Sequence, residues 1–133
     1  MSRIGDYISP VLRQRVAERA FFQCVYCLFP EENTFFRHQV DHIISLKHGG
    51  TSEFANLAYS CWLCNSFKGS DIASIDWSNG QLFRFYNPRV DVWSEHFKLN
   101  QLVIDPLSSI GAVTAAIFRF NDPERIEERK ALF

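Results

Sequence analysis

The sequence predicts an α+β protein organised as one domain, and its length, its composition and the order of its local patterns support this. A chain of 133 residues has the usual length of a single domain. Its apolar share of 47% and charged share of 22% are typical of globular proteins. An aromatic share of 15% excludes a mainly disordered chain. Helical and strand patterns alternate along the sequence, which favours a mixed fold.

Composition also limits where the protein acts and what it binds. No apolar run approaches the roughly 20 residues that a membrane helix needs, and Met1–Tyr7 lacks the apolar stretch of a secretory signal. We therefore expect a cytoplasmic protein without a membrane partner. Proteins that bind nucleic acid usually carry a basic surplus, whereas here Lys and Arg number 14 against 15 Asp and Glu. Composition alone does not indicate a nucleic-acid partner.

The first helix is predicted by its start and by its apolar stripe. Ser9 is a good N-cap and Pro10 suits the first helical turn. Leu12, Val16 and Ala20 recur at intervals of four, so they line one face. We expect this helix to end near Phe22.

The following segments predict the order strand, long loop, strand, helix. Thr34–Val40 is rich in strand formers and leads into Asp41 and His42. Gly49 and Gly50 break the chain within a loop. Leu57–Ser60 has the pattern of a second strand, and Asn65–Lys68 that of a helix start.

The second half carries weaker patterns. They predict a strand over Leu82–Tyr86, a helical turn over Asp91–His96, a strand over Phe97–Ile104, a helix over Ser109–Phe120 and a last helix capped by Asp122-Pro123-Glu124. The aromatic residues of this half are expected in the core: Trp77, Phe83, Phe85, Trp93 and Phe97.

The cysteines form two C-x-x-C pairs, Cys24 with Cys27 and Cys61 with Cys64. A reducing cytoplasm disfavours disulfides, whereas two such pairs suit four thiolates around one tetrahedral zinc ion. A site with four protein ligands has no open position, so its role is structural. A redox C-x-x-C pair and buried structural thiols are the alternatives.

The centre of the sequence contains three runs that belong together: Asp41–Gly50, Asn56-Leu57 and Cys61–Gly69. In this order, and with both cysteine pairs, they resemble the HNH endonuclease family. Arg15–Cys27 resembles the first helix and knuckle of bacterial members, and the segments Lys68–Ala73, Phe85–Arg89 and Trp93–Phe97 resemble the C-terminal extension of one bacterial subgroup with two zinc knuckles. The resemblance implies a ββα-metal (His-Me finger) core over about 24–70, within a single HNH domain spanning 1–133. An N-terminal helix and a C-terminal extension of strands and helices would flank this core.

The resemblance also assigns a catalytic set. It implies that His42 is the general base and that Asp41 ligates the catalytic metal. Asn65, where the family often has His, would be the second ligand of an H-N-N variant. A histidine suits proton transfer near neutral pH, and carboxylate and amide oxygens suit Mg²⁺ or Mn²⁺. The alternative for His42 is a surface or core histidine at a strand end.

Two further residues are expected to support the site. Asn56, the middle residue of the motif, is expected to fasten the long loop by side-chain to backbone hydrogen bonds, unless it is an ordinary loop asparagine. Lys68 is expected to contact a phosphate, with a solvated helix lysine as the alternative. We expect His38 and His48 to be exposed loop histidines and His96 to have a packing role.

The sequence therefore predicts a metal-dependent endonuclease acting on DNA, with double-stranded DNA as the expected substrate. One such site would nick one strand, so a homodimer or a recruiting protein is an expected partner. The rival is a non-catalytic zinc module that binds nucleic acid or protein. The retained set of Asp41, His42 and Asn65 separates the two, because a scaffold does not need it. A third reading, a redox dithiol protein, would contain no zinc.

Overall fold

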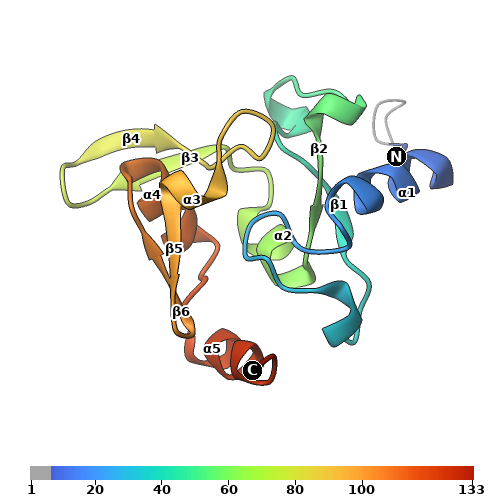
Figure 1. Cartoon of the computed structure of the whole chain (residues 1–133). Coiled ribbons are helices and arrows are strands. Elements are labelled where there is room, and N and C mark those ends of the chain that lie inside the picture. Colours follow the sequence, from blue (N-terminus) through green and yellow to red (C-terminus); the bar gives the residue numbers. More distant parts are fainter. Residues whose placement is uncertain (1–6) are drawn as a thin grey trace.

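The computed structural model describes residues 7–133, so the expectation about a secretory signal over Met1–Tyr7 falls almost wholly outside the described residues. Three antiparallel hairpins packed by helices make up these residues (Figure 1). The elements are α1 (Pro10–Arg19), β1 (Gln39–His42), β2 (Leu57–Ser60), α2 (Trp62–Lys68), β3 (Ala73–Asp76), β4 (Gln81–Arg84), α3 (Trp93–His96), β5 (Phe97–Asn100), β6 (Val103–Pro106), α4 (Ser109–Ile117) and α5 (Pro123–Lys130). This arrangement is the mixed α+β fold that the sequence predicts.

Helix α1 starts where its capping residues predict. The hydroxyl of Ser9 accepts a hydrogen bond from the Leu12 amide at 3.1 Å, and Pro10 is the first helical residue. The helix ends at Arg19, earlier than the predicted end near Phe22. Phe21 and Phe22 have left-handed backbones with φ of 54° and 57°, which close the helix and turn the chain toward the first cysteine pair.

Strands β1 and β2 and helix α2 confirm the predicted order of the central segment. The antiparallel register pairs Asp41 with Ala58 and His42 with Leu57. Two predicted bounds are wrong. Strand β1 begins at Gln39 because Thr34 turns the chain before it, donating to the carbonyls of residues 31 and 36. Residues 65–68 end α2 rather than start it, since the helix already begins at residue 62.

The second half differs more from its prediction. The expected single strand over Phe97–Ile104 is the hairpin β5–β6, because Gln101 adopts a left-handed φ of 57° and reverses the chain. Strand β3 was not predicted; it pairs with β4, and this hairpin extends to the left in Figure 1. Helix α4 packs on β3, β4 and β6.

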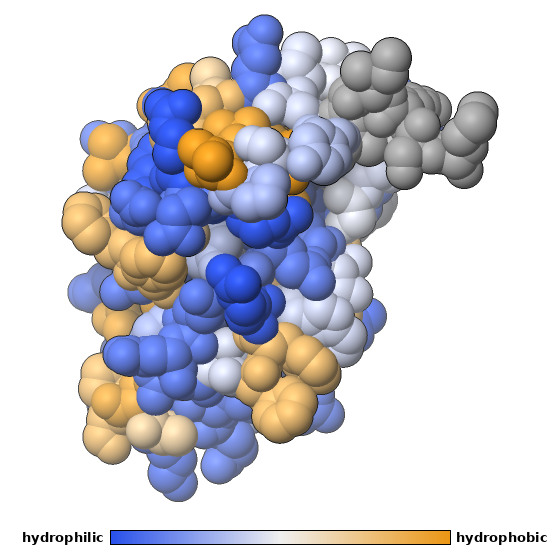
Figure 2. Space-filling view, turned by 90° about the vertical axis from the view of Figure 1, so that its right-hand side faces the viewer, coloured by the Kyte–Doolittle hydropathy of each residue, from blue (hydrophilic) through white to orange (hydrophobic). Residues whose placement is uncertain are grey.

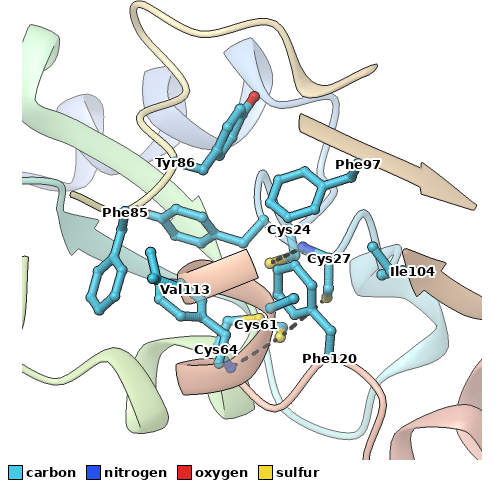
Figure 3. Packing of buried hydrophobic residues seen from close by; sticks show 13 residues of the cluster. Cys24, Cys27, Cys61, Cys64, Phe85, Tyr86, Phe97, Ile104, Val113 and Phe120 are labelled. Atoms are coloured by element: carbon cyan, nitrogen blue, oxygen red, sulfur yellow. Dashed lines mark hydrogen bonds between the residues drawn. The ribbon is translucent and has the colours of Figure 1, made fainter. Parts of the chain in front are cut away.

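The main core surrounds the cysteine sulfurs. Phe85, Phe97 and Phe120 are buried around them, as Figure 3 shows. Burial of Phe85 and Phe97 confirms their predicted place, whereas Trp77 is 84% exposed, and its core prediction is wrong. Trp77 directly follows β3, at the turn of the β3–β4 hairpin, where no other element among the described residues 7–133 covers its indole ring.

A smaller apolar cluster packs α1 against β2, with Val16 and Ala17 of the helix touching Leu57 and Tyr59 of the strand.

The surface is mixed in polarity. Figure 2 shows separate apolar patches among polar residues on the side of the molecule that carries α1. Among residues 7–133, no helix combines the length and the apolar character needed to cross a membrane.

Candidate functional site

The four cysteines converge in one buried cluster, with ligand atoms that all lie within 4.8 Å of one another. They are free thiols, and the Sγ atoms of Cys27 and Cys61 lie 3.7 Å apart. A disulfide needs about 2 Å, whereas tetrahedral zinc with bonds of about 2.3 Å separates its sulfurs by about 3.8 Å. The cluster therefore has the size of a tetrahedral thiolate site (Figure 3).

The electrostatics of the cluster also favour a cation. Hydrogen bonds from the other thiols lower the pKa of Cys27, while burial and hydrogen bonding raise the pKa of Cys64. Without a positive ion, the thiolates therefore oppose one another's ionisation. A divalent cation removes this conflict, because it stabilises all four thiolates together.

The two pairs are held by local backbone structure. In the first, the amide of Cys27 donates to the Cys24 sulfur at 3.5 Å. In the second, the Cys61 sulfur caps α2 by accepting from the amide of Cys64 at 3.4 Å. Each pair thus presents two sulfurs from one tight turn, which is the arrangement of a zinc knuckle.

Asp41 lies near the end of β1 and is buried, with 4% of its surface exposed. Its Oδ2 accepts a hydrogen bond from the hydroxyl of Tyr26 at 2.6 Å. Its Oδ1 lies 3.1 Å from Nζ of Lys68, whose ammonium also donates to the His42 carbonyl at 2.8 Å. Because Lys68 is 2% exposed, the alternative of a solvated helix lysine is wrong.

Burial and these contacts act on Asp41 in opposite directions. Desolvation raises the pKa of the carboxyl group, whereas the charge of Lys68 and the hydrogen bond from Tyr26 lower it, and the net direction is upward. The same burial and the neighbouring carboxylate raise the pKa of Tyr26 well above its usual value. Tyr26 therefore stays a protonated donor.

A pocket of about 360 Å³ is lined by Asp41, His42 and Asn65. Strand β1 ends at His42, so these two neighbours border the same space although adjacent strand residues alternate faces. Nε2 of His42 lies 2.9 Å from the hydroxyl of Ser52, which orients the ring. The amide nitrogen of Asn65 donates to Gln39. Its carbonyl oxygen is the atom with which this side chain can ligate a cation.

Asn56 fastens the loop between β1 and β2 by three hydrogen bonds. Its Oδ1 accepts from the Ile44 amide at 2.9 Å, and its Nδ2 donates to the carbonyls of Ile44 at 2.9 Å and Thr51 at 2.7 Å. These are the side-chain to backbone bonds expected of this residue. Gly50 completes the turn, because a Cβ there would stand 1.7 Å from the Ile44 carbonyl oxygen.

The remaining histidines divide between surface and interior. His48 is exposed, as expected. His38 is 4% exposed and bonded to the Phe29 carbonyl at 2.8 Å, so its expected place in an exposed loop is wrong. The ring of His96 packs edge to face against Tyr86, with centroids 6.1 Å apart, and its Nδ1 lies 2.6 Å from Ser108, the N-cap of α4; its packing role stays a prediction.

Sequence reasoning missed Tyr26 and Arg125. Tyr26 lies between the first two cysteines, and a phenol inside a zinc knuckle was an available signal. Arg125 donates to the sulfurs of the second pair from a helix far along the chain. No local pattern predicts a contact of that kind.

Comparison with known proteins identifies the central segment. Residues 24–71 match the family model described as HNH endonuclease. No curated protein and no solved structure matches the chain significantly. The matched segment contains both cysteine pairs, strands β1 and β2 and helix α2.

Proposed function

We propose that this chain, whose residues 24–71 belong to the HNH endonuclease family, hydrolyses phosphodiester bonds of DNA with the help of a divalent cation. One observation carries the proposal: Asp41, His42 and Asn65 line one pocket, although β1 and α2 supply them separately. A scaffold would not need a base and two hard oxygen donors at one opening.

His42 is the proposed general base. Its side chain lines the pocket in which the attacking water and the phosphate would bind, and the contact with Ser52 holds the imidazole in one orientation. An imidazole exchanges protons near neutral pH, so it can take the proton of the attacking water. Asn56 serves this step indirectly, by fixing the loop that follows His42.

Asp41 and Asn65 are the proposed ligands of Mg²⁺ or Mn²⁺, which would stabilise charge on the leaving oxygen. Lys68 already compensates the charge of Asp41, so we expect the cation to bind weakly. The proposed role of Lys68 is to hold Asp41 in place. Its contact with a substrate phosphate stays a prediction.

Cys24, Cys27, Cys61 and Cys64 are proposed to hold one structural zinc ion in a reducing cytoplasm. The cluster size and the free thiols support this. Because the zinc ligands come from both ends of the ββα segment, we expect zinc removal to unfold this segment.

The source of DNA affinity is a separate question. With no basic surplus in the chain, a homodimer or a recruiting protein is the proposed source of additional DNA affinity.

Relaxation of supercoiled plasmid tests the nuclease proposal. The zinc-loaded chain should convert it to open circles with Mg²⁺ or Mn²⁺ and not with a chelator of these ions, and Asp41→Asn should lose this activity. A zinc-loaded wild type that nicks with neither cation would favour the alternative, a non-catalytic zinc module for binding nucleic acid or protein.

A further inference from the structure

The last helix of the chain reaches the cysteine cluster through one side chain. Arg125 lies in the first turn of α5 and is 5% exposed. Its Nη2 donates to the sulfur of Cys64 at 3.2 Å and to that of Cys61 at 3.6 Å. Its Nη1 donates to the Phe118 carbonyl at 2.6 Å. The guanidinium is therefore bonded to both sulfurs of the second pair.

The contact between Arg125 and the cysteine sulfurs would compensate the charge of a four-thiolate zinc site. Such a site carries net negative charge, and buried charge is costly unless it is compensated. An arginine guanidinium is not deprotonated in proteins, so Arg125 places a buried positive charge directly beside these sulfurs. The guanidinium stays charged, and its N–H groups make charge-assisted bonds to sulfur.

We infer that Arg125 is the outer-sphere partner of the zinc-bound sulfurs of Cys61 and Cys64, and that it slows zinc loss and ties α5 to the metal site. Donors to metal-bound sulfur draw electron density from it, which makes the thiolate a poorer target for protons and competing electrophiles. The C-terminal helix is on this account a part of the zinc site. The inference rests on the proposed zinc site and is independent of the nuclease activity.

Arg129 is a matched control within the same helix. It lies one turn after Arg125, is also 5% exposed, and donates to the carbonyls of Leu102 and Phe120. Replacing either arginine removes a buried guanidinium from α5. Both side chains donate to backbone carbonyls, but the hydrogen bonds to sulfur are made by Arg125.

The test compares Arg125→Gln and Arg129→Gln in the zinc-loaded full chain. Zinc transfer to a chromophoric chelator is followed under native conditions, and urea unfolding of both variants reports global stability. Outer partners of metal ligands typically change metal affinity about 10–100-fold. We therefore expect zinc release from Arg125→Gln to be about tenfold faster than from Arg129→Gln.

Cobalt substitution adds a readout that packing alone does not move. Without the guanidinium N–H donors of Arg125, the thiolates become stronger electron donors. The sulfur-to-cobalt charge-transfer band should therefore move to lower energy in Arg125→Gln and stay in place in Arg129→Gln. If Arg125→Gln does not fold, Arg125→Lys and Arg129→Lys are compared by the same band.

Equal release rates and an unshifted band would overturn the inference, and Arg125 would then be a packing residue. Metal analysis without zinc in the native chain would remove the zinc proposal itself. The two failures are thus distinguishable.

Discussion

The hydroxyl of Tyr26 donates a 2.6 Å hydrogen bond to the carboxylate of Asp41 and thereby joins the cysteine cluster to the candidate active site. Tyr26 lies between Cys24 and Cys27, the first cysteine pair. The other oxygen of Asp41 is held by Lys68, which follows the second pair by one turn of α2. Each cysteine pair thus brings one partner to Asp41, so an ion that orders the pairs also orders the proposed metal ligand.

Tyr26→Phe should weaken the binding of the catalytic cation and leave the zinc ion in place. The Tyr26 hydrogen bond lowers the pKa of Asp41, so its loss raises that pKa further. Protonated Asp41 does not ligate a cation, and activity should therefore be lost at a higher pH than in wild type as the pH falls. Nicking rates against pH and Mg²⁺ concentration measure this. Tyr86→Phe, in the same core, is the control; identical profiles for wild type and Tyr26→Phe would refute the role.

The pair of Asp41 and Lys68 should be strongly coupled in stability. Both side chains are almost fully buried, so Lys68→Met leaves an uncompensated carboxylate in the core. Removing one partner of such a pair costs about 3–5 kcal/mol. Asp41→Asn combined with Lys68→Met should cost less than the sum of the single changes, by at least about 1 kcal/mol. Urea unfolding of all four chains measures the coupling, and additive effects would contradict it.

Gly50→Ala should damage the loop more than Gly49→Ala does. A Cβ at Gly50 meets the Ile44 carbonyl oxygen at 1.7 Å and the Asn56 amide nitrogen at 2.8 Å, so the loop must move. At Gly49 there is open space, and the cost is the left-handed φ of 87°, about 1–2 kcal/mol. Nicking rates at equal zinc content compare the two variants. Similar rates would mean that the fastened loop does not position His42.

Asn65→Ala should lose activity and recover part of it at higher cation concentration, because one neutral ligand is missing. Asn65→His should shift the preference toward Ni²⁺ or Co²⁺, since imidazole nitrogen suits such ions better than Mg²⁺. The measurement is nicking rate against the concentration of each cation. Superimposable curves for wild type and Asn65→Ala would remove Asn65 from the proposed metal shell.

What the sequence could predict depended on local spacing. The cysteine pairs, the order of β1, β2 and α2, and the loop bonds of Asn56 follow from short-range patterns. Trp77 was misplaced because hydrophobicity alone does not say whether another element covers a hairpin turn. The contacts of Tyr26 and Arg125 join segments distant in the chain, and neither residue belongs to a periodic pattern. The position of Tyr26 inside the first cysteine pair was a local signal that the prediction left unused, whereas only the folded arrangement identifies Arg125.

The most direct test of the account is the plasmid-nicking rate of zinc-loaded His42→Ala beside His48→Ala, an exposed histidine in the loop that follows β1. Loss of a general base should slow nicking at least about 100-fold, with zinc content and melting temperature close to wild type, while His48→Ala should cut normally. A His42→Ala variant that nicks at a rate comparable to wild type would contradict the central claim that this histidine activates the attacking water.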